Sequence, residues 1–345
     1  MKIAVIMGTR PEIIRLYHTV KALPDKTIYW TGQNFAKNLS TDIFEDPLLA
    51  DAYTEVVMLS TFEIENFAGQ FAIMIESLAD ELLRNRPDKV LILGDTNSSL
   101  AGALIAKKLG LPLYHMEAGN RCYDPNSPEE VNRKMIDSIA DVHMCYTQHA
   151  KQNLLAEGVP QNRIHVIGNP IAEFTTFHED NLSIKNHILV TCHRQENQKY
   201  IKQIIAALRF LGKNHKIIAC IHPRYNDYFR GQPGIETIPS VSFSHFISLE
   251  KRSKLIITDS GTVCEEAALL NIPCLIIRRT MERPELFDIG SCILTDVANG
   301  NKIVEDALEL LKEKPPTYIL PDEYWYPNPV SQRVKNIVLG KGNYI

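Results

Sequence analysis

Acidic side chains follow short apolar runs in the first half of the sequence. Asp95 comes shortly after the run 90–93, and Glu117 comes directly after the run 113–116. Glu129 lies at the start of an amphipathic stretch. Each acid alone has another explanation, because an aspartate before a helix can cap it and a carboxylate in the first turn interacts with the helix dipole. Together at one edge of a sheet they favour an acid/base site, since crowded buried carboxylates acquire separated pKa values.

Groups suited to binding an anion follow the first apolar run. Residues 8–12 come directly after residues 2–7 and begin with a glycine, which permits a tight turn. The next helix would present N–H groups at its N-terminus, and Arg10 could grip phosphate with two hydrogen bonds. The alternative is a turn that carries an ordinary surface arginine, and this motif alone does not decide between them.

The second half of the sequence offers a comparable set. His193 follows residues 187–191 and could donate to phosphate or carry a proton, although a single histidine is more often structural. Residues 259–262 follow residues 255–258 and lead into a predicted helix. The backbone N–H groups at such a junction form a cradle for pyrophosphate.

Two further groups are expected at the same sheet edge. An acid one turn into that helix, within Glu265-Glu266, could accept hydrogen bonds from both hydroxyls of a ribose. Arg283 comes after the apolar run 274–277 and would face the same cleft.

Short apolar runs alternate with amphipathic stretches almost throughout the chain. This rhythm is typical of crossover connections and of a parallel sheet covered on both faces. The predicted strands are residues 2–7, 27–30, 90–93, 113–116, 142–146 and 164–167, followed by 187–191, 217–221, 255–258 and 274–277. The predicted helices are residues 13–23, 98–109, 131–139 and 148–157, followed by 199–210, 262–270 and 303–311.

The restart of the pattern predicts two Rossmann-like α/β domains facing a cleft. A Gly-Asn-Pro turn at residues 168–170 and a polar stretch at 178–186 mark the boundary. We expect an N-terminal domain at residues 1–170, a C-terminal domain at 171–325, and a final segment at 326–345 that packs back on the first domain. Because open α/β sheets bind ligands beyond the carboxyl ends of their strands, the cleft between them is the expected site.

Bulk composition restricts the partners. The 345 residues are 45% hydrophobic and 23% charged, with a formal net charge of -4 and no long basic run. We therefore expect no nucleic-acid partner and no membrane partner, and no apolar run approaches the ~20 residues of a membrane span. The 7 cysteines are scattered without C-x-x-C spacing, which predicts reduced thiols and a cytoplasmic location.

Several familiar chemistries lack their motifs. The sequence contains neither G-x-G-x-x-G nor the P-loop pattern, which argues against a bound dinucleotide or a kinase-like site. It also lacks G-x-S-x-G, so a hydrolase nucleophile elbow is unsupported. His222 and His245 are isolated, and we therefore expect no metal site.

The motifs, taken as an ordered set, resemble those of the non-hydrolysing UDP-N-acetylglucosamine 2-epimerases. The matches run in order from residue 2 to about residue 290, and this order makes the set specific. The matching motifs are Gly8-Thr9-Arg10-Pro11-Glu12, Thr31-Gly32-Gln33, Gly94-Asp95-Thr96, Glu117-Ala118-Gly119, Pro128-Glu129-Glu130, Asn132-Arg133, Gly168-Asn169, His193-Arg194, Asp259-Ser260-Gly261, Glu265-Glu266 and Glu282-Arg283-Pro284-Glu285.

The resemblance implies a fold similar to the GT-B glycosyltransferases, with a UDP-sugar between the domains. Members of this family abstract the C2 proton, eliminate UDP to a bound glycal, and add UDP back with a proton delivered from the other face. No cofactor is implied, and we expect a homodimer. The catalytic residues implied are Asp95, Glu117, Glu129 and His193. The residues implied to contact phosphate, sugar, ribose or uracil are Arg10, Arg15, Phe246, Ser260, Gly261, Thr262, Glu266 and Arg283.

Some positions depart from the commonest pattern of the family. Arg15 stands where lysine is usual, and Cys192 stands where glycine is usual. Asn120 replaces a usual leucine, and Thr262 replaces a usual second glycine. Together with Asn97, these positions look more like the branch that acts on UDP-linked 6-deoxy-L-hexosamines for surface polysaccharide. We therefore expect a UDP-2-acetamido-2,6-dideoxy-L-hexose of the L-rhamno or L-talo configuration as substrate.

Three other functions stay open on the sequence. The first is a 2-epimerase that acts on UDP-GlcNAc and UDP-ManNAc. The second is a GT-B glycosyltransferase with the same nucleotide site, but it needs one base, whereas three acids stand in family contexts here. The third is an inactive sugar-nucleotide sensor, which the retained acids disfavour.

Overall fold

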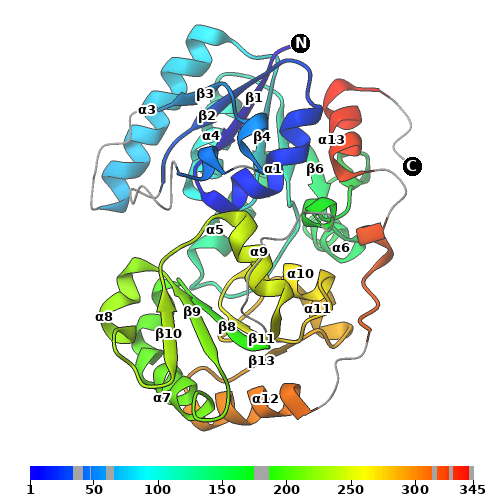
Figure 1. The fold of residues 1–345 in the computed structure, drawn as a ribbon. Coiled ribbons are helices and arrows are strands. Elements are labelled where there is room, and N and C mark those ends of the chain that lie inside the picture. Colours follow the sequence, from blue (N-terminus) through cyan, green and yellow to red (C-terminus); the bar gives the residue numbers. More distant parts are fainter. Residues whose placement is uncertain are drawn as a thin grey trace. The chain divides into compact units, whose positions relative to one another are not determined.

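The computed structural model describes residues 1–33, 42–46, 48–59, 66–174, 186–312, 317–325 and 329–341. The chain divides into two compact units (Figure 1). The first unit contains Met1–Phe174 and Pro321–Ile345, and the second contains Thr175–Leu320.

The first unit is built on a 7-stranded sheet in which every pair of neighbours is parallel. Its strands are β1 (Ile3–Met7), β2 (Lys26–Trp30), β3 (Val56–Met58), β4 (Lys89–Leu93), β5 (Leu113–Met116), β6 (Val142–Cys145) and β7 (Ile164–Val166). The spatial order is β3-β2-β1-β4-β5-β6-β7, so the direction of winding reverses between β1 and β4. This order is that of the doubly wound nucleotide-binding folds.

Helices cover both faces of this sheet. They are α1 (Arg10–Ala22), α3 (Phe67–Asn85), α4 (Asn97–Lys108), α5 (Pro128–Ile139), α6 (Gln148–Ala156) and α13 (Val330–Leu339). On one face α3, α4 and α5 pack in a row, where Met74, Leu78 and Leu82 of α3 share a core with Ala4 and Ile6 of β1. Because side chains alternate along a strand, the neighbours of Ala4 and Ile6 face the other layer. There α1 packs against β1, and α13 packs against α1.

The second unit repeats this plan with a 6-stranded parallel sheet in the order β10-β9-β8-β11-β12-β13. Its strands are β8 (His187–Cys192), β9 (Ile217–Ile221), β10 (Ile235–Ile238), β11 (Ser253–Thr258), β12 (Cys274–Ile276) and β13 (Cys292–Leu294). Its helices are α7 (Ile201–Leu211), α8 (Asn226–Phe229), α9 (Phe243–Lys251), α10 (Gly261–Leu269), α11 (Pro284–Asp288) and α12 (Gly300–Lys312). Helices α7 and α12 pack together on one face, and α9 and α10 pack on the sheet as well.

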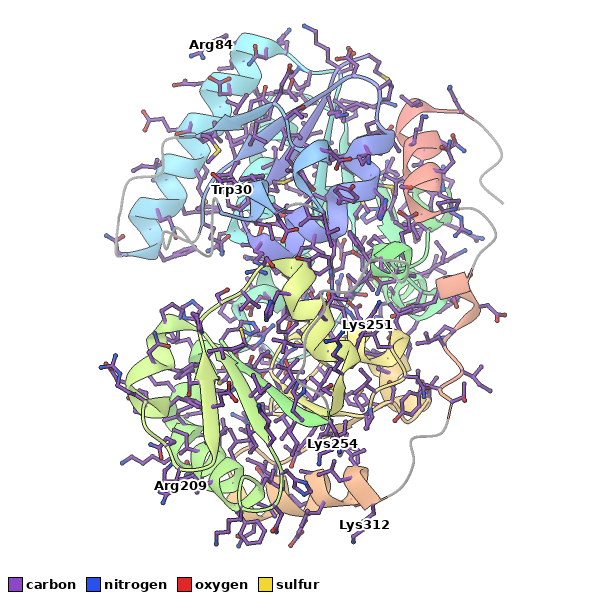
Figure 2. All side chains as sticks on the ribbon, in the orientation of Figure 1. Trp30, Arg84, Arg209, Lys251, Lys254 and Lys312 are labelled. Atoms are coloured by element: carbon purple, nitrogen blue, oxygen red, sulfur yellow. The ribbon has the colours of Figure 1, made fainter. Side chains whose placement is uncertain are left out.

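Side chains divide between core and solvent as this plan requires. Trp30, at the end of β2, is only 2% exposed, whereas Arg84 near the end of α3 and Lys312 at the end of α12 are exposed (Figure 2). No helix among the described residues is both long enough and apolar enough to cross a membrane.

The unit boundaries differ from those that the sequence suggested, which were residues 170/171 and 325/326. Residues 171–174 belong to the 3-10 helix η4 (Pro170–Phe174), which packs against α1 in the first unit. The chain returns to the first unit at Pro321. Tyr324 accounts for the second difference, because it is 5% exposed and its hydroxyl accepts a hydrogen bond of 3.2 Å from Nδ2 of Asn169.

The predicted fold class of two Rossmann-like α/β domains is confirmed, and each predicted strand is present. The prediction missed β3, β10 and β13, which are short strands at sheet edges, where a long apolar run is not required. It also missed α3, α8, α9, α11 and α13, although α3 carries a clear signal in buried residues at every fourth position. The predicted helix 199–210 starts as a 3-10 turn, Gln195–Tyr200, before α7. Most of the polar stretch 178–186, and residues 326–328 of the tail, lie outside the described residues.

Candidate functional site

Both sheets have a switch point, where neighbouring strands lead to crossovers in opposite directions. In the first unit the switch lies between β1 and β4, and in the second it lies between β8 and β11. Doubly wound sheets bind their ligands at the carboxyl ends of the strands beside such a point. The loops that carry Arg10, Asp95, His193 and Ser260 follow these four strands in turn. Each unit therefore presents its sequence-predicted site residues at the position that the topology favours.

Glu12 ties together the two loops at the switch point of the first unit. Its carboxylate accepts hydrogen bonds from the backbone N–H groups of Gly8 and Thr9, at 2.9 and 2.7 Å, and from the hydroxyls of Thr96 and Ser99, both at 3.0 Å. Burial raises the pKa of Glu12 above its usual value, and these hydrogen bonds oppose the rise without cancelling it. The loop after β1 is therefore held by a carboxylate of the chain itself, through N–H groups that directly precede α1.

Gly8 is required at its position for a reason other than the expected turn. A Cβ atom there would lie 1.9 Å from the hydroxyl oxygen of Ser98 and 2.3 Å from that of Thr31. These two hydroxyls are themselves 2.5 Å apart. The glycine thus permits close approach of the β1 loop to the start of α4, and any larger residue would separate them.

Glu117 is held in an uncommon backbone conformation at the end of β5. Its φ is +66°, in the left-handed region that few residues other than glycine adopt. Its Oε2 lies 2.5 Å from Nη1 of Arg15 and accepts a hydrogen bond of 3.3 Å from the hydroxyl of Tyr146. Its Oε1 accepts a hydrogen bond of 3.4 Å from Nδ2 of Asn120. Non-glycine residues at positive φ concentrate at functional sites, where the surrounding contacts compensate for the strain.

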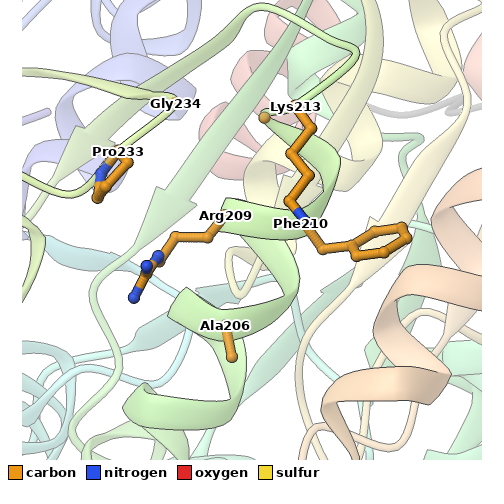
Figure 3. A pocket seen from close by; sticks show the side chains of 7 residues that line it. Ala206, Arg209, Phe210, Lys213, Pro233 and Gly234 are labelled. Carbon is orange, nitrogen blue, oxygen red and sulfur yellow. The ribbon is translucent and has the colours of Figure 1, made fainter.

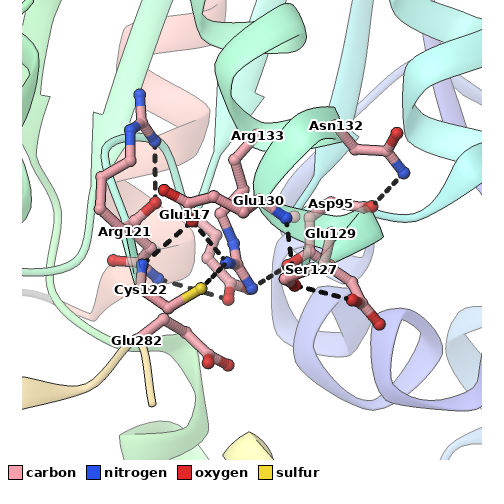
Figure 4. A network of polar contacts seen from close by, with 12 residues as sticks. Asp95, Glu117, Arg121, Cys122, Ser127, Glu129, Glu130, Asn132, Arg133 and Glu282 are labelled. Atoms are coloured by element: carbon pink, nitrogen blue, oxygen red, sulfur yellow. Dashed lines mark hydrogen bonds and ion pairs between the residues drawn. The ribbon is translucent and has the colours of Figure 1, made fainter. Parts of the chain in front are cut away.

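Asp95 pairs with an arginine of α5. Its Oδ2 lies 2.5 Å from Nη2 of Arg133, and Nη1 of the same arginine lies 3.0 Å from Oε2 of Glu130 (Figure 4). Helix α4 is capped by Thr96, whose side chain accepts from the N–H of Ser99. The explanation of Asp95 as a helix cap is therefore wrong, and its side chain instead pairs with Arg133.

Glu129 and Glu130 begin α5 but have different surroundings. Glu130 is fully buried and accepts hydrogen bonds from the backbone N–H groups of Cys122 and Tyr123. Glu129 is half-buried at the start of the helix and accepts a hydrogen bond of 3.0 Å from the hydroxyl of Ser127. Glu130 therefore fixes the preceding loop, whereas Glu129 retains access to solvent.

In the second unit a single buried carboxylate organises the loop after β8. Asp259 accepts hydrogen bonds from the backbone N–H groups of His193 and Arg194 and from Nδ2 of Asn197, at 2.9 to 3.1 Å. Its Oδ1 also lies 2.7 Å from Nδ1 of His193. Burial alone would raise the pKa of Asp259, but His193 and the hydrogen bonds outweigh it and hold this pKa well below the usual value. With Nδ1 of His193 fixed, its other nitrogen is directed away from Asp259, and the side chain is 45% exposed.

The predicted pyrophosphate cradle lies at the start of α10. Ser260 caps this helix by accepting from the N–H of Val263, and Gly261 and Thr262 follow it half-buried. A Cβ atom on Gly261 would come within 2.8 Å of a carboxylate oxygen of Glu282. Glu266, one turn into the helix, is buried beside Glu250, whose pKa is raised well above its usual value first by burial and then by the charge of Glu266.

The remaining predicted binding residues have diverse environments. Arg10 is half-buried at the start of α1, and Phe246 is half-buried on α9. Arg283 is only 2% exposed, and its Nε lies 2.5 Å from Oε1 of Glu265. This ion pair joins α10 to α11, so the charge of Arg283 is already matched within the second unit.

Comparison with known proteins decides which family has this arrangement. The family model described as UDP-N-acetylglucosamine 2-epimerase matches residues 20–338. A UDP-N-acetylglucosamine 2-epimerase of Methanocaldococcus jannaschii is 36% identical over 346 residues, with 91% of this chain and 93% of that protein covered. The UDP-2,3-diacetamido-2,3-dideoxy-D-glucuronate 2-epimerase of Pseudomonas aeruginosa is 31% identical, with 89% and 91% covered.

The chain belongs to the UDP-N-acetylglucosamine 2-epimerase family. It is therefore an enzyme that epimerises a UDP-linked sugar at C2, which is an isomerase reaction. Solved structures agree with this. The crystal structure of the Methanocaldococcus jannaschii UDP-GlcNAc 2-epimerase in complex with UDP-GlcNAc and UDP has a TM-score of 0.89 at 32% identity, with 99% of this chain and 100% of that chain covered. The co-structure of S. aureus MnaA with UDP has a TM-score of 0.86 at 28% identity, with 100% and 97% covered.

In this epimerase several residues that contact the predicted site residues were not themselves predicted as site residues. Arg133, Tyr146 and Asp259 contact Asp95, Glu117 and His193 respectively, and Glu130 contacts Arg133. The sequence spacing could have indicated Arg133, because this residue lies one helical turn after Glu129 and Glu130 and so on the same side of α5. No sequence pattern indicated Tyr146, because only the pairing of β5 with β6 brings it beside Glu117.

A hollow with a volume of about 430 Å³ lies elsewhere on the second unit of the epimerase (Figure 3). It is lined by Ala206, Arg209, Phe210, Gly212, Lys213, Pro233 and Gly234. Gly212 and Gly234 precede β9 and β10, so the hollow lies at the amino ends of the strands, opposite the edge that carries His193. Among the described residues, no group of three His, Cys, Asp or Glu side chains could hold a metal ion.

We predict that Asp259→Asn destabilises the epimerase, and that the effect depends on pH. Since the pKa of Asp259 is depressed in the folded state, its charge stabilises the fold above the unfolded pKa of about 4, and this contribution is lost as the pH falls below it. At pH 7 the variant should lose about 2 kcal/mol or more of unfolding free energy, because several hydrogen bonds to a charged group are weakened.

Unfolding followed from pH 7 to pH 3 provides the measurement. The difference between the native protein and the Asp259→Asn variant should shrink toward acid pH. Asp227→Asn is the control, because the side chain of Asp227 is 92% exposed. A difference that stays constant across this range would show that the charge of Asp259 does not stabilise the fold.

Proposed function

We propose that the enzyme inverts C2 of a UDP-2-acetamido-2,6-dideoxy-L-hexose of the L-rhamno or L-talo configuration, a precursor of surface polysaccharide. We further propose that it works in the cytoplasm as a homodimer, without a cofactor. The observation that carries the acid/base part is the cluster of Asp95, Glu117 and Glu129 at one edge of the first sheet. Each acid is oriented there by a hydrogen-bonding partner.

The reaction that these acids serve is an elimination followed by the reverse addition. One carboxylate takes the proton from C2, the electron pair of that C–H bond forms the C1=C2 double bond, and the C1–O bond breaks so that UDP leaves with its electron pair. UDP then adds back to C1 of the glycal while an acid delivers a proton to the opposite face of C2. Because the C2 proton is weakly acidic, both a positioned base and a stabilised leaving group are required.

Asp95, Glu117 and Glu129 are proposed to supply the base and the proton donor, and His193 to contact phosphate and assist catalysis. The fixed Nδ1 of His193 supports this role, because it directs the other ring nitrogen away from Asp259. A fixed tautomer and orientation are what a histidine needs to donate to a phosphate oxygen.

The nucleotide is proposed to bind the second unit. Backbone N–H groups at the start of α10, beside Ser260, Gly261 and Thr262, would hold the diphosphate, because a helix N-terminus carries partial positive charge. Glu266 would accept hydrogen bonds from the ribose, and Phe246 would lie beside the uracil. Arg10, Arg15 and Arg283 are proposed to hold phosphate or sugar. Arg15 and Arg283 would do so while they also keep their ion pairs with Glu117 and Glu265.

The choice of sugar is supported by where the unusual residues lie. Arg15 and Asn120 both depart from the commonest pattern of the family, and both contact the carboxylate of Glu117. Asn97 accepts a hydrogen bond from Asn132, whose amide also donates to the backbone carbonyl of Asp95. Arg15 and Asn120 thus contact a proposed catalytic acid directly, Asn97 is linked to the backbone of Asp95 through Asn132, and Cys192 and Thr262 lie in the second unit. The Pseudomonas aeruginosa relative supports the idea that proteins of similar identity act on sugars other than UDP-GlcNAc.

Two alternatives compete with this proposal. A 2-epimerase of UDP-GlcNAc and UDP-ManNAc is favoured by the names of most relatives. A glycosyltransferase is favoured only by the fold, since the glycosyltransferase of kitacinnamycin has a TM-score of 0.54 at 11% identity. Deuterium exchange at C2 and competition between substrates separate these alternatives.

The first prediction from the proposed function concerns catalysis. Turnover should fall by ~100-fold or more, the scale for loss of a general acid or base, in each of the variants Asp95→Asn, Glu117→Gln, Glu129→Gln and His193→Ala. The measurement is incorporation of deuterium at C2 in deuterated water, followed by NMR. Asp80→Asn, an exposed residue on α3, is the control and should be unaffected. Near-normal exchange in two of the four variants would overturn the assignment of this site, and no exchange in the native protein would favour a transferase.

The second prediction concerns the nucleotide. Gly261→Val and Glu266→Ala should each weaken binding of UDP itself by about 10-fold or more, because the valine displaces Glu282 and the alanine removes the ribose acceptor. Isothermal calorimetry with UDP measures this. Glu305→Ala, which changes an exposed glutamate on α12, should bind UDP normally. Unchanged affinity in both test variants would mean that UDP binds elsewhere.

The third prediction concerns the sugar. Competition assays should give a higher kcat/KM for the UDP-2-acetamido-2,6-dideoxy-L-hexoses than for UDP-GlcNAc. A site built for a 6-hydroxyl leaves polar groups unpaired when a 6-methyl group arrives, whereas an apolar site tolerates or prefers that group. Asn120→Leu, which restores the commoner residue, should reduce this preference. Equal turnover of both substrates would refute the choice of sugar and leave the epimerase assignment intact.

A further inference from the structure

Asp137 is a buried carboxylate outside the set of acids proposed to move protons. It lies on α5 and is 3% exposed. Its side chain contacts three groups, namely the ring of His115, the backbone N–H of Gly119 and the guanidinium of Arg121. Burial alone would raise the pKa of Asp137, but these neighbours outweigh burial and lower it to about 2. The carboxylate is therefore ionised at neutral pH.

The first contact leads to Asp95. Oδ1 of Asp137 lies 2.8 Å from Nδ1 of His115, and Nε2 of the same ring lies 2.9 Å from the carbonyl oxygen of Gly94. A carbonyl can only accept, so the hydrogen bond to Gly94 is donated by Nε2, while Nδ1 faces the carboxylate of Asp137. Gly94 has a φ of +72° and directly precedes Asp95. The imidazole of His115 is thus a rigid link from α5 to the residue that sets the direction of Asp95.

The second contact leads to Glu117. Oδ2 of Asp137 accepts a hydrogen bond of 3.1 Å from the N–H of Gly119, two residues after Glu117. Both positions have positive φ, +66° for Glu117 and +81° for Gly119. The same Oδ2 lies 2.8 Å from Nη1 of Arg121, whose Nε in turn donates to Glu157 of the α6 C-terminus at 2.8 Å. The strained turn that carries Glu117 is therefore held in place by contacts with the residues that follow Glu117.

We infer that Asp137 is a positioning residue for catalysis, which sets the placement of Asp95 through His115 and of Glu117 through Gly119. The inference rests on the proposed roles of Asp95 and Glu117. One carboxylate fixes two loops that follow neighbouring strands, so Asp95 and Glu117 keep fixed positions relative to each other. This matters for the rate, because a displacement of about 1 Å in a reacting group can lower it ~100-fold.

The main test is Asp137→Asn in the full-length enzyme. The amide cannot accept from His115 and Arg121 as the charged group does, so both loops should shift. We expect kcat and the rate of C2 deuterium exchange to fall by about 10-fold to 100-fold. UDP affinity by calorimetry should stay within about two-fold, since the cradle belongs to the other unit.

A stability control separates positioning from simple destabilisation. Leu82→Ala removes a fully buried side chain of α3 in the same unit and should lower the melting temperature as well. If Asp137 positions the acids, Leu82→Ala keeps normal exchange below its melting temperature while Asp137→Asn does not. Equal loss of exchange in both variants, or normal exchange in Asp137→Asn, would overturn the inference.

Two variants of His115 test the linkage itself. His115→Gln can place an amide N–H where Nε2 donates to Gly94, whereas His115→Asn can place one only where Nδ1 meets Asp137. The glutamine variant should therefore retain at least several-fold more exchange activity than the asparagine variant. Equal activity of the two would show that the bond to Gly94 has no role in catalysis.

Failure of this inference is distinguishable from failure of the proposed function. If Asp95→Asn and Glu117→Gln lose exchange while Asp137→Asn does not, the catalytic acids stand and the positioning role falls. If Asp95→Asn and Glu117→Gln retain normal exchange, the proposed catalytic roles fall, and the positioning role falls with them.

Discussion

A carboxylate removed from water loses hydration that only hydrogen bonds and opposite charge can replace. Glu12, Asp137 and Asp259 are each at most 3% exposed, and each gathers N–H donors from loops at the ends of parallel strands. Satisfying one such group requires several backbone segments to converge on it. These three acids therefore act as internal cross-links, and the shape of the strand-end loops follows from their need for partners.

The acids proposed for catalysis are held in another way. Asp95 and Glu117 each meet the guanidinium of an arginine, from α5 and α1 respectively, and Glu129 meets a serine hydroxyl. Because a guanidinium is planar and permanently charged, it fixes the direction of a carboxylate more tightly than an ammonium group does. Backbone N–H groups thus contribute to holding Glu12, Asp137 and Asp259, whereas side chains orient the acids proposed for catalysis.

The two units share one topology but use their switch points differently. In the first unit the N–H groups of Gly8 and Thr9 bind Glu12, so the loop after β1 is closed on the chain itself. In the second unit Asp259 closes the loop after β8, while Ser260 and Gly261 begin α10. The proposal above accordingly assigns the acids to the first unit and the nucleotide to the second.

The sequence by itself determined the fold class, because strands buried on both faces need apolar runs, and it drew attention to the acids that follow those runs. It could not supply the edge strands β3, β10 and β13, whose short length carries little periodicity. It also could not show that Arg283 is matched by Glu265, or that Glu12 accepts hydrogen bonds from the loop after β1. Such pairings depend on how loops and helices pack once the sheet has formed, and the register of neighbouring strands decides which of them meet. Asp137 shows this best, since its link to Gly94 exists only because β4 pairs with β5 and brings His115 beside the loop of Asp95.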